Sequence, residues 1–172
     1  MNRMLIAAAL AAALALTGLT ACGDSDSSSA ASDKSSQTAS EADKTIDVSA
    51  AADRFKNEIK WVDTLNVLED DMVEKITGVK PDLYNSAKVY VGAGGATAEE
   101  IAVFEAKDIT AADNIKKAYE ERIEAQKKAF ENYVPGELVK LNDPLLTTAK
   151  TYVFVCISDD RSKAMEIVSE LI

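Results

Sequence analysis

The sequence predicts an α+β domain over residues 45–172, in which an antiparallel sheet of about four strands packs against helices on one face. Three observations favour this class. Apolar residues alternate with others at 87–91 and 101–106, as is typical of strands. Six consecutive apolar residues at 152–157 indicate a strand covered on both sides and therefore central in its sheet. A helical period of apolar residues extends over 111–133.

Two helices are expected before the sheet. The first begins at Ser49, because Phe55 and Ile59 follow at helical spacing. The second extends over Glu69–Thr77, with acidic residues near its N-terminus and Gly78 at its end.

The strands are expected to form two hairpins, each followed by a helix. The glycine-rich segment 92–95 joins the first pair; it lacks the spacing of a phosphate loop and precedes a strand instead of a helix. The second pair, 145–148 and 152–157, turns at Lys150-Thr151, where a tight turn usually has Gly or Asn. A last helix opens at Asp159-Asp160. The domain therefore resembles two hairpin-plus-helix units.

The composition excludes much familiar chemistry. The chain of 172 residues has no His, which removes His-based zinc sites and Ser-His-Asp or Cys-His nucleophiles. Its net charge of −10 disfavours nucleic acid as a partner. The acidic segments Glu69-Asp70-Asp71 and Asp159-Asp160 do not match the ligand spacing of a calcium loop, and helix N-terminal charge explains both. We expect neither a metal nor a cofactor.

The N-terminus predicts a bacterial lipoprotein signal. One Arg precedes the apolar run Leu5–Leu16, whose 12 residues are too few to cross about 30 Å of hydrocarbon. This run is typical of a signal peptide over residues 1–21. The sequence Leu19-Thr20-Ala21-Cys22 then resembles a lipobox, in which the cysteine is acylated and becomes the mature N-terminus. The alternative is a plain secretory signal with a cysteine there by chance.

A flexible tether follows Cys22. Residues 23–44 contain eight Ser and five Asp or Glu, a composition that cannot form a core. We expect residues 22–44 to hold a single globular domain, 45–172, near the extracytoplasmic face of the cell membrane. Lipid on Cys22 would be the membrane contact, because more than one acyl chain on a residue anchors well.

Candidate binding residues within the domain are aromatic and acidic. Tyr84 and Tyr90 lie on a predicted strand and are free to be surface contacts, and Glu105 lies on a strand face otherwise occupied by apolar residues. Glu105 therefore needs either solvent or a buried Lys or Arg partner. Tyr133 ends the apolar stripe of the long helix, so its ring belongs to the core and its hydroxyl to the rim.

Two further groups have structural explanations. Glu99 and Glu100 are adjacent, so on a strand they point to opposite faces and cannot flank one substrate. Cys156 lies in the most apolar strand, where a free cysteine behaves as a small hydrophobic residue.

Several stretches together resemble a family of domains of unknown function found in lipoproteins of Gram-positive bacteria. They are Glu99–Asp108, Gln126–Phe130, Tyr133–Glu137 and Tyr152–Asp160. The most specific are EIAVFEAKD and the F-x-x-Y-x-P pattern. The resemblance extends over about 48–172 and implies an extracytoplasmic lipoprotein with a small α+β domain. It supplies no catalytic residues, and only Cys22 carries over with a defined role.

These observations predict a membrane-anchored, non-catalytic accessory domain that binds another cell-envelope component, most plausibly a protein. Two alternatives stay open. The acidic balance and the Tyr84, Tyr90 and Glu105 group would also suit a small molecule or cation. A carboxylate-based glycan hydrolase using Glu105 is the least favoured alternative.

Overall fold

The computed structural model of the protein describes residues 45–172. The predicted signal peptide, the lipobox with Cys22 and the tether lie outside these residues. Among the described residues, no helix is both long enough and apolar enough to cross a membrane.

The described residues form five α-helices and one five-stranded antiparallel sheet, which confirms the predicted α+β class. The helices are α1 (Val48–Glu58), α2 (Asp70–Thr77), α3 (Ile109–Glu131), α4 (Leu138–Asn142) and α5 (Arg161–Leu171). The strands are β1 (Leu65–Val67), β2 (Tyr84–Gly92), β3 (Glu100–Ala106), β4 (Leu145–Ala149) and β5 (Tyr152–Ile157). Their order in the sheet is β1-β2-β3-β5-β4, so β3 is the middle strand and β5 is an interior strand between β3 and the edge strand β4.

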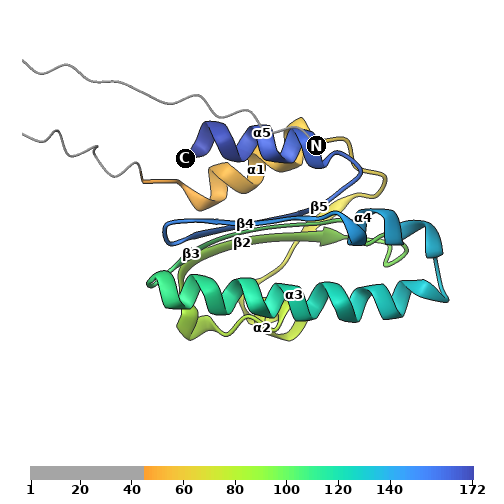
Figure 1. Ribbon diagram of the computed structural model, residues 1–172, viewed down its shortest axis with the longest axis horizontal. Coiled ribbons are helices and arrows are strands. Elements are labelled where there is room, and N and C mark those ends of the chain that lie inside the picture. The colour runs from red at the N-terminus through yellow and green to blue at the C-terminus, as the bar shows by residue number, and fades with distance from the viewer. Residues whose placement is uncertain (1–44) are drawn as a thin grey trace, which may run out of the picture. The chain divides into compact units, whose positions relative to one another are not determined.

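Helices cover both faces of the sheet, so the prediction that they pack on one face is wrong. Figure 1 shows α1 and α5 on one side of the strands and α2 and α3 on the other. The reason lies in the central strands, which are apolar on both faces. In β3, Ile101 and Val103 contact the core beneath α1 and α5, whereas Ala102 and Phe104 contact the core beneath α3. Each apolar face needs its own cover.

The sheet has one strand more than the sequence suggested. β1 is only three residues long, and Leu65 lies opposite Gly92 of β2. Its burial pattern leaves Asn66 and Val67 exposed, so the segment lacks the alternation by which longer strands are recognised.

Local sequence explains where the helices begin. Asp47 caps α1 by accepting a hydrogen bond from the Ala50 amide at 2.9 Å. Asp108 caps α3 through the Ala111 amide at 2.7 Å. Asp160 caps α5 in the same way through Lys163.

Left-handed backbone occurs at three described residues, Gly78, Gly95 and Lys150, of which the first and last bear on the sequence predictions. Gly78 ends α2 at φ +76°, as its sequence position predicted. Lys150 occupies the tight turn between β4 and β5 at φ +54°, a conformation in which Gly or Asn is more common.

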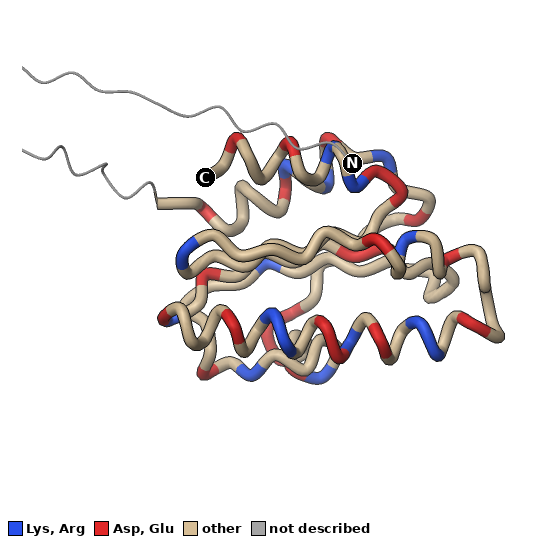
Figure 2. Tube along the Cα trace, viewed as in Figure 1, with Lys and Arg blue, Asp and Glu red and all other residues tan. Residues whose placement is uncertain are grey.

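The two predicted hairpin-plus-helix units exist, but their helices lie on opposite faces. The first is β2–β3–α3 and the second is β4–β5–α5. Residues of α3 belong to one core and residues of α5 to the other. Figure 2 shows charged residues spaced along the helices and few on the strands, which places the acidic surface on the two outer layers.

Candidate binding groove

The structure does not gather the predicted tyrosines. A β-bulge between Tyr84 and Ser86 shifts the register of β2, so Tyr84 and Tyr90 contact opposite cores. The Tyr84 ring lies edge-on to Phe104, with centroids 5.4 Å apart. Tyr90 is buried, which contradicts the expectation of a surface contact. Its hydroxyl donates a hydrogen bond to Asp53 at 2.5 Å. Burial and, to a smaller extent, this hydrogen bond raise the pKa of Tyr90 to about 12.

The other two predicted residues lie elsewhere. Glu105 is partly buried and accepts a hydrogen bond from the Ser86 hydroxyl at 3.2 Å. It lies opposite Ser86, whereas Tyr90 lies opposite Ile101, so the two side chains are four residues apart along β3. Tyr133 follows the end of α3 and is 68% exposed, so it does not belong to the core. Tyr84, Tyr90, Glu105 and Tyr133 therefore do not form one site.

The buried ion pairs involve the adjacent residues Glu99 and Glu100 instead. Glu99 accepts hydrogen bonds from the amides of Val62 and Asp63, each at 2.9 Å, and pairs with Lys140 at 3.1 Å. Burial alone would lower the pKa of Lys140, but hydrogen bonds to Glu137 and Glu99 raise it overall. This cluster joins the segment after α1, the start of β3 and α4, and its carboxylate is fully occupied by protein donors.

Glu100 points to the other side, toward α3, as expected for neighbouring residues. Its side chain is 1% exposed and accepts from Arg122 Nε at 3.0 and 3.1 Å and from Nη2 at 2.6 Å. Arg122 also donates to the Ile76 carbonyl at the end of α2. Burial lowers the pKa of Arg122 and Glu100 raises it, with a net rise. The guanidinium thus links the sheet, α2 and α3.

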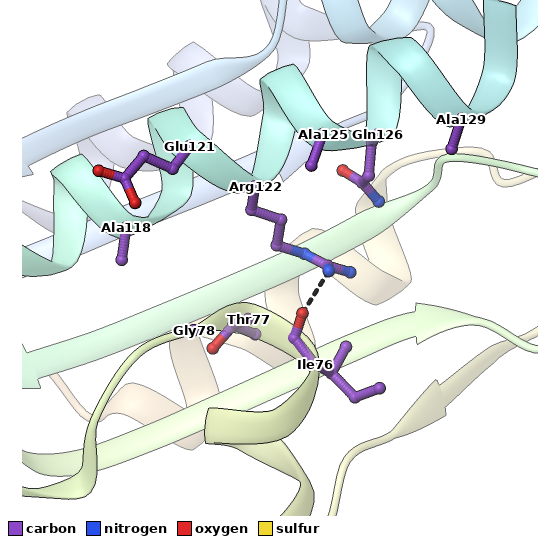
Figure 3. Close-up of a pocket in the computed structure, with 9 residues that line it drawn as sticks. All are labelled: Ile76, Thr77, Gly78, Ala118, Glu121, Arg122, Ala125, Gln126 and Ala129. Atoms are coloured by element: carbon purple, nitrogen blue, oxygen red, sulfur yellow. Dashed lines mark hydrogen bonds between the residues drawn. The ribbon is translucent and has the colours of Figure 1, made fainter.

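A groove of about 490 Å³ opens beside this pair, between the end of α2 and α3. Its α2 wall contains Thr77 and Gly78. Its α3 wall presents small side chains, namely Ala118, Ala125 and Ala129. Figure 3 shows Arg122 reaching from α3 toward Ile76 between these walls, with Gln126 one turn further along the helix. The Gln126 Oε1 atom is buried and has no hydrogen-bond partner among the described residues.

The groove is bordered by acidic side chains on α3. Glu121 lines it directly, and Glu120, Glu124 and Lys128 line an adjoining hollow on the same helix. Glu124 pairs with Lys127 at 2.7 Å, so three carboxylates and two amines leave this rim a small negative charge, while Glu100 neutralises the Arg122 guanidinium inside.

Tyr119 lies one turn before Arg122 on α3 and is fully buried. Its hydroxyl has no hydrogen-bond partner among residues 45–172. Burial raises the pKa of Tyr119 well above its ordinary value of 10, and the charge of Glu100 raises it further.

The remaining candidate chemistry is structural. Cys156 is 1% exposed, and burial raises the pKa of its thiol to about 12, which confirms that it belongs to the core. Asp70 and Asp71 occupy the first turn of α2. Within 45–172, no group of three or more acidic or cysteine side chains is arranged to hold a metal ion.

These features define a three-layer α+β domain with one buried ion pair, Glu100–Arg122, on the α2 and α3 side of its sheet and a second, Glu99–Lys140, that points the other way. The chain belongs to the family described as "Domain of unknown function (DUF4358)", whose model matches residues 61–158. The match includes the whole sheet and α2, α3 and α4, but neither α1 nor α5. No curated protein and no solved structure matches the chain.

Proposed function

We propose that the protein is a lipid-anchored, non-catalytic binding domain of the extracytoplasmic membrane face, whose groove between α2 and α3 receives a segment of another envelope protein. The observation that carries the binding site is the open groove beside the Arg122–Glu100 pair. The anchor rests on the sequence around Cys22.

The position of the carboxylates supports a non-catalytic role. Hydrolysis of a glycan needs two carboxyl groups on either side of one bond. Glu99 is occupied by two amides and Lys140, and Glu100 by Arg122. Glu105 lies on the opposite face of the sheet from Glu100, because Glu105 pairs with Tyr152 and Glu100 with Ile157, which belong to different cores.

The walls and rim of the groove favour a protein segment. The alanines of α3 let a partner backbone approach closely, and the rim carboxylates Glu120 and Glu121 favour a segment that carries Lys or Arg. The unpartnered Gln126 Oε1 could accept a hydrogen bond from such a segment.

Site-specific photocrosslinking tests the groove. A photoreactive residue at Ala125, inside the groove, should yield a discrete adduct in intact cells, whereas one at Asp113, exposed on the same helix outside it, should not. Equal adducts at both positions, or none at either, would contradict the proposed binding site.

Detergent partitioning tests the anchor separately. The wild type should carry a diacylglyceryl mass on Cys22 and enter the detergent phase, while Cys22→Ala stays uncleaved and unlipidated. If both forms appear unlipidated in the medium, the protein is a secreted binder instead.

A small-molecule or cation ligand is the second candidate, because a groove of about 490 Å³ has the size of a ligand pocket. A ligand at 100 times its Kd adds about 2.7 kcal/mol to the free energy of unfolding, which a thermal-shift screen detects. A flat profile across divalent cations, sugars and peptides would remove this candidate.

A further inference from the structure

Strand β4 is an edge of the sheet, with Pro144 before its first residue and Lys150 after its last. Within the described residues it pairs only with β5. Its sequence Leu145–Ala149 contains no charge, proline or bulge, which are the usual devices against edge-to-edge pairing. The other edge, β1, is protected by its length of only three residues.

The hairpin geometry fixes which backbone groups of β4 point outward. Ala149 lies opposite Tyr152 on either side of a two-residue turn, and such flanking residues exchange hydrogen bonds. Every second residue of β4, Ala149, Thr147 and Leu145, therefore bonds to β5. Leu146 and Thr148 present their N–H and C=O groups to the outside.

An apolar groove of about 300 Å³ lies beside this edge, between β4 and α5. Leu145 and Thr147 contribute from the strand. Met165 of α5 and Ile172, which follows that helix, contribute from the other side and are 47% and 61% exposed, and Arg161 lies at the start of the same wall. The edge thus offers both unpaired backbone groups and uncovered apolar side chains.

We propose that β4 pairs antiparallel with β4 of a second copy of this chain, so that the two sheets become one. The two-fold axis passes between the two Thr147 residues. In this register Leu146 of one copy lies opposite Thr148 of the other, so the outward-facing residues meet each other. With the two-fold axis at any other position along the strand, at least one residue of β4 would have no partner in β4 of the other copy.

Charge at the ends of β4 agrees with this register. Lys150 follows one end of the strand and Asp143 precedes the other, separated from it by Pro144. Antiparallel pairing brings the lysine of each copy next to the partner's Pro144 and close to the partner's Asp143. Asp143 of each copy, which pairs with Arg161 of its own chain at 3.1 Å, then has the partner's lysine beside it as well.

The symmetry also determines which helices of the two copies lie on the same face of the joined sheet. A two-fold axis perpendicular to the sheet leaves both α5 helices on the same face, where Met165 and Ile172 of each copy cover the groove of the other. Ile46, next to the start of the described chain, packs in the core on that face. The N-terminal end of the described chain therefore lies on the α1 and α5 side of the sheet in both copies.

Disulfide trapping in the full-length chain tests the register. Directly opposed residues that do not exchange hydrogen bonds have Cα atoms about 4.5 Å apart, within the range that a disulfide spans. Thr147→Cys should therefore shift from monomer to covalent dimer on a non-reducing gel after mild oxidation. Thr148→Cys is the matched control, because it lies opposite Leu146 and should stay monomeric.

The outcomes separate this interface from the anchor. Each variant is made with Cys22 and with Cys22→Ala, and a Thr147→Cys dimer in either background supports edge pairing. Absence of the dimer in both, or equal trapping of Thr148→Cys, overturns it whatever the detergent partitioning shows. Thr148→Pro added to Thr147→Cys should abolish trapping, and an unchanged melting temperature would show that the domain still folds.

Discussion

The two faces of the sheet are closed in different ways. Beneath α1 and α5 the core residues are mainly apolar, and the Tyr90 hydroxyl donates a hydrogen bond to Asp53. The arginine on this side, Arg54, lies at the surface, where it pairs with Glu58 and Glu170. Beneath α2 and α3, Arg122 forms an ion pair with the buried Glu100, and an open groove lies beside this pair. The family match includes the second of these layers and stops short of both helices of the first. An Arg–Glu ion pair is thus partly exposed on one face of the sheet and buried on the other.

Arg122→Met should have the largest effect, because it leaves the buried Glu100 carboxylate without its partner. We expect a loss of about 3–5 kcal/mol in the free energy of unfolding, measured by urea denaturation. The matched variant on the other face, Arg54→Met, should change stability little, since its partners are in solvent. Arg122→Met combined with Glu100→Leu should recover most of the loss; failure to recover would show that charge burial is not the cause.

Gly78→Ala comes next. Space is open around the position, so the cost comes only from a left-handed backbone at φ +76°. We expect a loss of about 1–2 kcal/mol by chemical denaturation. An unchanged midpoint would mean that the end of α2 adjusts freely and does not form a fixed wall of the groove.

Alkaline pH should destabilise both layers. The folded state raises the pKa of Cys156, on the α1 and α5 side, from 9.0 to about 12, and raises that of Tyr119 on the other side. The unfolded chain therefore releases these protons first, and stability falls as pH rises above about 9, by roughly 1 kcal/mol per pH unit for each group. Cys156→Ala should flatten the slope between pH 9 and 10, before tyrosine contributes. A slope that is unchanged in this variant would contradict the assignment.

The smallest effects should distinguish two buried tyrosines. Tyr90→Phe loses a hydrogen bond to Asp53 and should cost about 1 kcal/mol. Tyr119→Phe removes a hydroxyl that has no partner among the described residues, so it should be neutral or slightly stabilising. Thermal denaturation of the two variants side by side checks the difference, and equal losses would show that Tyr119 does have a hydrogen bond.

Much of the fold was predictable because local patterns determined it. The apolar run of β5 indicated a strand covered on both sides, and Gly78 indicated the end of α2. The same run already contradicted helices on one face only, since a doubly buried strand needs two layers. β1 was not recognisable, because a three-residue edge strand is held by pairing with β2 and carries no pattern of its own.

The candidate site was less predictable, since it depends on contacts between distant residues. Glu99 and Glu100 were correctly expected to point apart, but their partners are 41 and 22 residues further along the chain. One signal was available: Arg122 lies between Tyr119 and Gln126, at the border of the apolar stripe of α3. The bulge that separates Tyr84 from Tyr90 left no mark in the sequence.

The pairing of the first helix with the last affects how this chain can fold as it is made. Arg54 and Glu58 of α1 contact Glu170 and Lys163 of α5, more than 100 residues later. The central strand β5 also arrives late, about 50 residues after its neighbour β3. Because the ribosome synthesises the N-terminus first, neither core can be completed until almost the whole chain has been made. Such non-local topology slows folding, so the contacts that close both cores are the last to become available.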